Sequence, residues 1–261
     1  MKPVRNIRLD LAFDGTAYHG WQMQKELPTV QGTLRAAIRK VTGEQVDLIG
    51  SGRTDAGTHA RAYVANFRTA GAIPPSGLMR ALNGILPPDI RVMSAREVPL
   101  AFHARRDARS KVYRYQVYLG PVLPPHLARE WFHYPRPLDL EKMQRAAELF
   151  QGTHDFASFA AADAAAKRPS GRGTVRTIFR CRLAARGRRV TLTVEGDGFL
   201  HHMVRNMVGT LIEVGCGRMG LREFRALFGR RDRRLAGFTA PACGLALVKV
   251  RYGRVPRPAK A

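Results

Sequence analysis

The chain has 261 residues, 45% hydrophobic and 25% charged, which is the composition of a folded protein with one large domain or two smaller ones. Lysine and arginine number 44 against 20 aspartate and glutamate residues, giving a formal net charge of +24. This excess favours nucleic acid as the partner over an anionic membrane surface or an acidic metabolite. The sequence has no apolar run of membrane-spanning length and no signal-peptide pattern, so we expect a cytoplasmic protein without a membrane span.

The first half of the chain predicts a mixture of strands and helices. Alternating apolar residues predict a strand over 7–13. Apolar residues at helical spacing, with Thr29 as cap and Gly43 as stop, predict a short helix. Further strands are expected over 46–49 and 62–67, and a second short helix over 78–86.

The second half repeats this mixture, so the expected fold class is α+β. The predicted elements are a strand over 112–118, helices over 140–150, 200–211 and 221–228, a hairpin of 174–184 with 189–195, and a last strand over 245–252. A polar, aperiodic stretch near 102–110 separates the halves. We therefore expect an N-terminal domain over 1–104, a C-terminal domain over 105–252 and a flexible basic tail over 253–261. The segment 160–173 is also expected to be mobile.

A glycine-rich segment over 50–61 is the most informative stretch. It lacks the Lys and Ser or Thr of a nucleotide-binding P-loop and the third glycine of a dinucleotide fingerprint. What remains is one acid, Asp55, between Arg53 and Arg61 in a loop that glycines let bend sharply. An aspartate is ionised at neutral pH and suits a nucleophile better than an acid catalyst. The alternative is that Asp55 caps a turn or pairs with an arginine.

A metal site is not expected. His201 and His202 are adjacent, and adjacent residues on a helix point about 100° apart. Zinc ligands on a helix instead recur at i and i+4. The three cysteines, Cys181, Cys216 and Cys243, form no C-x-x-C pair and are expected to fill the core.

The segment Gly52–Ala60 resembles the G-R-T-D-A-G-x-H-A signature of the tRNA pseudouridine synthase A (TruA) family, with Thr58 at the variable position. Further blocks that resemble this family follow in register at 13–16, 20–24, 29–31, 102–105, 113–115, 152–159, 176–178, 199–206 and 244–248. The resemblance covers roughly residues 7 to 250. One short motif is weak evidence, whereas a series in the same order is specific.

The resemblance implies isomerisation of uridine to pseudouridine at positions 38, 39 and 40 of the tRNA anticodon stem-loop, with no cofactor and no metal. It also implies two ferredoxin-like α+β halves, with antiparallel sheets joined across a basic central cleft in the pseudouridine synthase fold. By the same resemblance the expected partners are tRNA and a second copy of the chain in a homodimer.

The resemblance also assigns roles to single residues. Asp55 matches the family's catalytic aspartate, Arg205 the arginine paired with it, Tyr113 the tyrosine that stacks on the base, and Leu245 an apolar residue lining the uracil pocket. Tyr113 and Tyr115 lie two apart on a predicted strand and so face the same way, and core packing is the alternative role for both. The residues do not decide whether Asp55 attacks C1′ or C6 or takes a proton from the sugar.

Arginines near the expected cleft are the candidates for RNA binding, since their planar fork binds phosphate. They are Arg53, Arg61, Arg105, Arg106, Arg168, Arg172 and Arg176. The alternative function is a non-catalytic RNA-binding protein. Intact Asp55, Tyr113 and Arg205 favour the enzyme, because a pure binder has no use for an acid inside a basic cleft.

Overall fold

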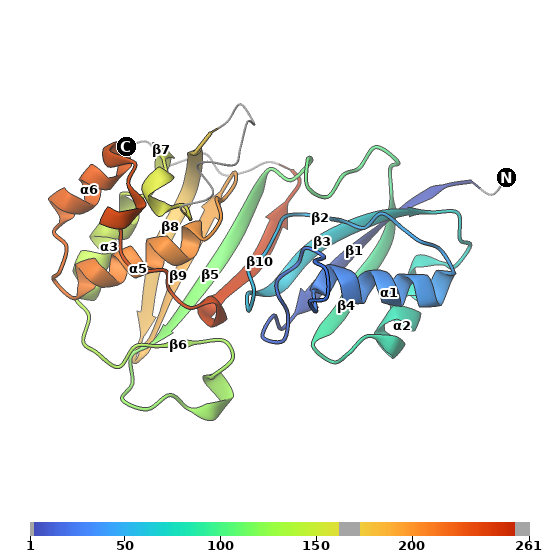
Figure 1. The fold of residues 1–261 in the computed structure, drawn as a ribbon, viewed down its shortest axis with the longest axis horizontal. Helices are drawn as coiled ribbons and strands as arrows, with labels where there is room; N and C mark the ends of the chain where they lie inside the picture. The colour runs from blue at the N-terminus through green and yellow to red at the C-terminus, as the bar shows by residue number, and fades with distance from the viewer. Residues whose placement is uncertain (1–2, 162–172, 254–261) are drawn as a thin grey trace. The chain divides into compact units, whose positions relative to one another are not determined.

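The computed structural model describes residues 3–161 and 173–253, which group into two compact units (Figure 1). Unit 1 comprises Met1–Arg109 with Ala246–Gly253, and unit 2 comprises Ser110–Leu245. The tail expected over 253–261 lies outside the described residues beyond Gly253, as does most of the segment 160–173. None of the helices in the described ranges has the length and apolar character needed to span a bilayer.

Unit 1 has the chain order βαββαβ of a ferredoxin-like fold. Its elements are β1 (Arg5–Phe13), α1 (Val30–Thr42), β2 (Ile49–Gly50), β3 (His59–Thr69), α2 (Pro75–Ile85) and β4 (Ile90–Val98). The strands β4, β1 and β3 are antiparallel neighbours, and the short β2 pairs with β3. From the end of the chain, β10 (Leu245–Arg251) adds a parallel pairing to β3 through Ala246 and Leu247.

The core of unit 1 follows the apolar pattern of its elements. Ile7, Leu9 and Leu11 alternate on β1 and are fully buried, whereas the positions between them are partly exposed. The helix α1 begins where the Thr29 hydroxyl accepts from Gly32 N, at 3.2 Å, and ends at Gly43, which has φ 75°. These caps confirm the helix ends predicted from sequence. With them, the sheet holds the 51–58 loop at the start of β3.

Unit 2 contains the strands β5 (Ser110–Tyr118), β6 (Phe132–His133), β7 (Gly152–Asp155), β8 (Val175–Arg186) and β9 (Arg189–Gly196). Its longer helices are α3 (Leu140–Glu148), α5 (Met203–Gly215) and α6 (Leu221–Arg230). The strand order is β5-β9-β8-β7, all antiparallel, with β6 parallel to β5. If the short strands β6 and β7 are left out, the elements β5, α3, β8, β9 and α5 follow the first five places of the βαββαβ order. The sixth place along the chain is taken by β10.

The structure corrects the predicted elements in four places. Only Ile49 and Gly50 form a strand where 46–49 was expected, because Val46 and Leu48 are buried as loop residues. The helix expected from Leu200 begins at Met203. Three strands, β4, β6 and β7, were not predicted. Residues 246–252 group with unit 1, although the sequence placed them in the domain over 105–252, since β10 pairs with β3.

Candidate active site

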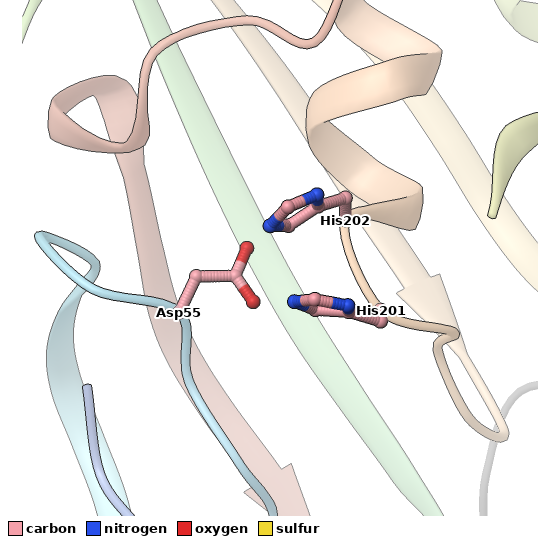
Figure 2. Close-up of side chains that lie close together, drawn as sticks. All are labelled: Asp55, His201 and His202. Atoms are coloured by element: carbon pink, nitrogen blue, oxygen red, sulfur yellow. The ribbon is translucent and has the colours of Figure 1, made fainter. Parts of the chain in front are cut away.

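The loop of residues 51–58 carries Asp55 and is tied to the rest of unit 1 by backbone hydrogen bonds. Thr58 N donates to Asp55 O at 3.1 Å, which closes a turn around the aspartate. Gly57 N donates to Tyr18 O at 3.1 Å, which joins this turn to the segment after β1. Figure 2 shows the Asp55 carboxylate pointing away from the loop backbone. The loop is therefore fixed while its acid projects from it.

Two glycines let the segment after β1 lie directly against this loop. Gly20 has φ 81°, and a β-carbon built on it would lie 2.2 Å from Thr54 O. A β-carbon on Gly15 would lie 2.1 Å from Thr58 O. Both distances are far below van der Waals contact, so only glycine fits at either position. The backbone of residues 15–20 thus acts as a tight support on both sides of Asp55.

Aromatic packing supports the start of the same loop. The ring of Tyr63 on β3 stacks on Trp21, with ring centroids 4.2 Å apart and an interplanar angle of 28°. The Tyr63 hydroxyl donates to Gly52 O. Both side chains are almost completely buried. The loop is therefore supported by buried aromatic rings. The free energy that stabilises its position comes from packing in the core of unit 1.

The loop surroundings are polar and basic. Arg53 and Arg61 are exposed on either side of Asp55, which is itself half-buried. The hydroxyls of Ser51, Thr54 and Thr58 are buried and have no hydrogen-bond partner among the described residues. Buried hydroxyls are normally hydrogen-bonded, so these three leave unused polar capacity beside the acid.

In unit 2, the two tyrosines predicted to share a face of β5 have different environments. Tyr115 is fully buried, and its hydroxyl donates to Pro241 O at 2.6 Å. Burial raises the pKa of Tyr115 well above its usual range. Tyr113 is 8% exposed and meets Phe199 edge-on, with ring centroids 4.9 Å apart. Tyr115 is therefore a core residue, and Tyr113 is also largely buried, against Phe199.

Arg205 and Leu245 also lie in unit 2. The Nε of Arg205, on α5, donates to Ala240 O at 2.7 Å, and Ala240 N donates back to Arg205 O at 3.2 Å. Leu245 is buried at the first residue of β10. These two hydrogen bonds fix the Nε end of the Arg205 guanidinium relative to the segment before β10. The pairing of Arg205 with Asp55 stays a prediction.

The structure corrects the placement of the two histidines. His201 and His202 precede α5 instead of lying on it, because His202 is the N-cap residue with φ 59°. Their rings are close, with centroids 3.9 Å apart, where helical geometry predicted divergent directions (Figure 2). A positive φ is uncommon for a residue with a side chain and often marks a functional turn. Two imidazoles alone do not complete the four ligands of a zinc site.

The arginines expected to bind RNA differ in exposure. Arg53, Arg61, Arg105 and Arg106 are exposed in unit 1. Arg176 is only 6% exposed, and its Nη1 donates to the carbonyls of Gly173 and Val175. Arg168 and Arg172 lie outside the described residues. In the chain as described, Arg176 therefore positions backbone, whereas the four arginines in unit 1 have exposed side chains.

Sequence reasoning gave no role to Asn206, which the structure places at the centre of a hydrogen-bond network. Its Nδ2 donates to Phe159 O at 2.8 Å, and its Oδ1 accepts from Thr239 Oγ1 at 2.7 Å and from Arg233 Nη2 at 3.0 Å. Asn206 is completely buried one residue after Arg205. The sequence feature that could have indicated this role is the polar amide of Asn206 within an otherwise apolar helix.

Comparison with known proteins identifies the family. The family model described as tRNA pseudouridine synthase matches residues 11–107 and 146–253. The chain belongs to the tRNA pseudouridine synthase family. The family's fold is the one that the sequence resemblance predicted, and its members are isomerases that convert uridine to pseudouridine. This chain is therefore an isomerase of that kind.

Curated relatives cover nearly the whole synthase. The tRNA pseudouridine synthase A of Acetivibrio thermocellus is 46% identical over 249 residues, 95% of this chain and 100% of the relative. The enzyme of the same name from Solibacter usitatus is 45% identical over 252 residues, with the same coverage. A solved archaeal box H/ACA Nop10-Cbf5 complex is similar with a TM-score of 0.37 and 11% identity, over 79% of this chain and 44% of that chain.

The support of Asp55 by Gly20 is testable with a matched glycine. We expect Gly20→Ala to lower the rate of pseudouridine formation about 100-fold, because the new β-carbon displaces the loop at Thr54. Gly43→Ala is the control, since Gly43 also has a positive φ but a β-carbon there meets nothing within 4 Å. It should cost about 1 kcal/mol of stability and leave the rate unchanged. Equal rates for the two variants would contradict the role of Gly20.

Proposed function

We propose that this chain isomerises uridine to pseudouridine at positions 38, 39 and 40 of the tRNA anticodon stem-loop, with Asp55 as the catalytic nucleophile. The observation that carries the proposal is the rigid loop that projects Asp55 between two exposed arginines. The full-length relatives named tRNA pseudouridine synthase A support tRNA as the substrate. The target positions come from the resemblance of the motifs.

The reaction rearranges one nucleotide without a net change of composition. The bond from C1′ to N1 breaks, the uracil turns within the site, and C5 forms a new bond to C1′. The proton leaves C5, and N1 gains one. No electron is transferred to or from the substrate, so the chemistry requires no redox cofactor, and we propose that it proceeds without a metal.

In this proposal Asp55 forms a transient bond to the substrate at C1′ or C6. A carboxylate is a competent nucleophile once it is oriented, and the fixed loop supplies the orientation. Proton abstraction from the sugar is the alternative route for the same carboxylate. In the same proposal Arg205 pairs with Asp55 and orients its carboxylate.

Tyr113 and Leu245 hold the uracil. The target base must leave its stack before it reacts, which costs a few kcal/mol. Stacking on an aromatic ring returns about 1–3 kcal/mol of this. Tyr113 packs against Phe199 and is 8% exposed, and Leu245 is a buried apolar side chain at the first residue of β10. The Tyr113 hydroxyl is also our candidate acceptor of the C5 proton.

The basic surface binds the rest of the tRNA. Arg53, Arg61, Arg105 and Arg106 are exposed in unit 1 and bind phosphate in this proposal, together with the sequence-predicted Arg168 and Arg172. Arg176, although also predicted to bind RNA, is buried and holds backbone carbonyls instead. The proposal includes a homodimer, whose formal charge would be twice +24, and a cytoplasmic location, where tRNA is the substrate. A chain that bound tRNA without turnover would instead be a non-catalytic RNA-binding protein.

The nucleophile is tested with tRNA carrying tritium at uracil C5. The native chain should release tritium as pseudouridine forms, and Asp55→Asn should abolish release while tRNA affinity stays within about threefold. The amide has nearly the same shape but is not nucleophilic, so binding and chemistry separate. Tritium release by Asp55→Asn would contradict the assignment, and binding without release by the native chain would favour the RNA-binding protein.

Tyr113→Phe tests the hydroxyl proposed as proton acceptor, with Tyr115→Phe as control. Tyr113→Phe should bind tRNA normally and lose most tritium release, because the C5 proton has lost its acceptor. Tyr115→Phe should keep the rate but lose about 1 kcal/mol of stability, since its buried hydroxyl donates to Pro241 O. Tritium release at the native rate by Tyr113→Phe would show that the Tyr113 hydroxyl is not the proton acceptor.

A further inference from the structure

A basic concavity lies in unit 2 at the tip of the β8–β9 hairpin. It has a volume of about 350 Å³, within the range of pockets that hold small ligands. We call this concavity the hairpin pocket. It is lined by Tyr118, Pro124, Leu127, Arg186, Arg188 and Arg189. Three of these six side chains are arginines, and none is acidic.

The hairpin places its arginines close together. Arg186 and Arg189 are direct cross-strand partners, and the turn between them consists of Gly187, with φ 55°, and Arg188. Leu119 N donates to Arg188 O at 2.8 Å, which ties the turn to the end of β5. Like charges directly opposite on a hairpin destabilise it. An anion bound between them would remove this repulsion.

The arginines of the hairpin pocket have no acidic partner within residues 3–161 and 173–253. None of its three arginines forms an ion pair with an acidic residue in the part of the chain that the structure describes. By contrast, Arg218 is paired with Glu213 at 2.5 Å and Arg234 with Asp232 at 2.7 Å. Guanidinium groups without a carboxylate are the ones available for phosphate.

Aromatic rings accompany these arginines. Tyr118 is the cross-strand partner of Arg189 on β5 and lines the pocket. The guanidinium of Arg189 also lies over the ring of Trp131, 5.6 Å from its centroid. Basic side chains interleaved with aromatic faces are typical of surfaces that bind a nucleic acid strand, since they take both phosphate and base.

The basic character continues along the same face of the sheet. Arg182, Thr193 and Arg114 form a cross-strand row, four residues along β5 from Tyr118 and about 13 Å from it. The Nε of Arg114 is buried without a hydrogen-bond partner among the described residues. Tyr113 is on the opposite face of β5, because successive side chains alternate. This surface is therefore separate from the side of the sheet that carries Tyr113.

We propose that the hairpin pocket and the Arg182–Arg114 row form a second RNA-binding site, which takes the sugar–phosphate backbone of the tRNA substrate away from the reacting uridine. The arginines bind successive phosphates, and Tyr118 stacks on a base. A length of about 13 Å spans several phosphates of one strand, whereas a free anion would occupy only one end. The inference rests on the proposed function for the identity of the RNA.

The test removes three charges from two surfaces of unit 2. One variant is Arg186→Ala with Arg188→Ala and Arg189→Ala, and the control is Arg222→Ala with Arg225→Ala and Arg230→Ala, all exposed on α6. Binding of unmodified tRNA is measured against salt, together with the rate at saturating enzyme. The hairpin variant should bind at least tenfold more weakly, with a log–log salt slope shallower by about 2. Its saturating rate should stay within twofold of native.

The control should change affinity less than threefold. Equal losses in the two triple variants would show a general effect of net charge and overturn the proposal, as would native affinity in the hairpin variant. If the triple variant fails to fold, Arg188→Ala alone should lower the slope by about 1, because Arg188 lies in the turn and has no cross-strand partner.

The outcomes also separate this inference from the proposed function. Normal turnover with native tRNA affinity in the hairpin variant would refute the second site alone. Loss of affinity in that variant, in a chain that releases no tritium, would support the RNA site and refute the catalytic proposal.

Discussion

The site depends on one close contact, the backbone of residues 15–20 lying directly against the loop of Asp55. This contact requires glycine at positions 15 and 20, because a single added carbon would overlap the carbonyls of Thr58 and Thr54. Three hydroxyls of the loop are buried and unpartnered among the described residues. Its order comes from the neighbouring core, where Trp21 and Tyr63 are stacked and buried. The loop that carries Asp55 is thus held in place by the stability of a whole ferredoxin-like unit.

In unit 2, successive side chains of β5 point to opposite faces of the sheet, and the two faces differ in chemical character. One face of β5 carries Tyr113 and Tyr115 among apolar residues, and the other carries Arg114 and Tyr118 beside the basic residues of β8 and β9. Neutral packing on one face suits a base that must be shielded from water, while charge on the other suits a phosphate chain. The net charge of +24 is therefore unevenly distributed over the two faces of this sheet.

Much of the fold was predictable where local chemistry decides structure, as at the caps Thr29 and Gly43 of α1. The strand β4 was missed because exposed residues such as Met93 interrupt its apolar alternation at a sheet edge. His202 was misplaced because only tertiary contacts impose a positive φ on a residue that is not glycine. The burial of Arg176 was not predictable either, because nothing in the neighbouring sequence distinguishes this arginine from the exposed ones. Asp55 could be singled out as a candidate because its motif is contiguous, whereas the network of Asn206 joins distant segments.

The central claim is that the fixed loop sets the position of the Asp55 carboxylate, and Asp55→Glu tests it most directly. This variant keeps the charge and moves the carboxylate by one methylene group. Single-turnover rates of pseudouridine formation should fall at least 100-fold with tRNA affinity unchanged, because a displacement of about 1 Å is enough to lose the reactive geometry. A rate within tenfold of native would contradict the account, since it would show that charge in this loop matters and its position does not.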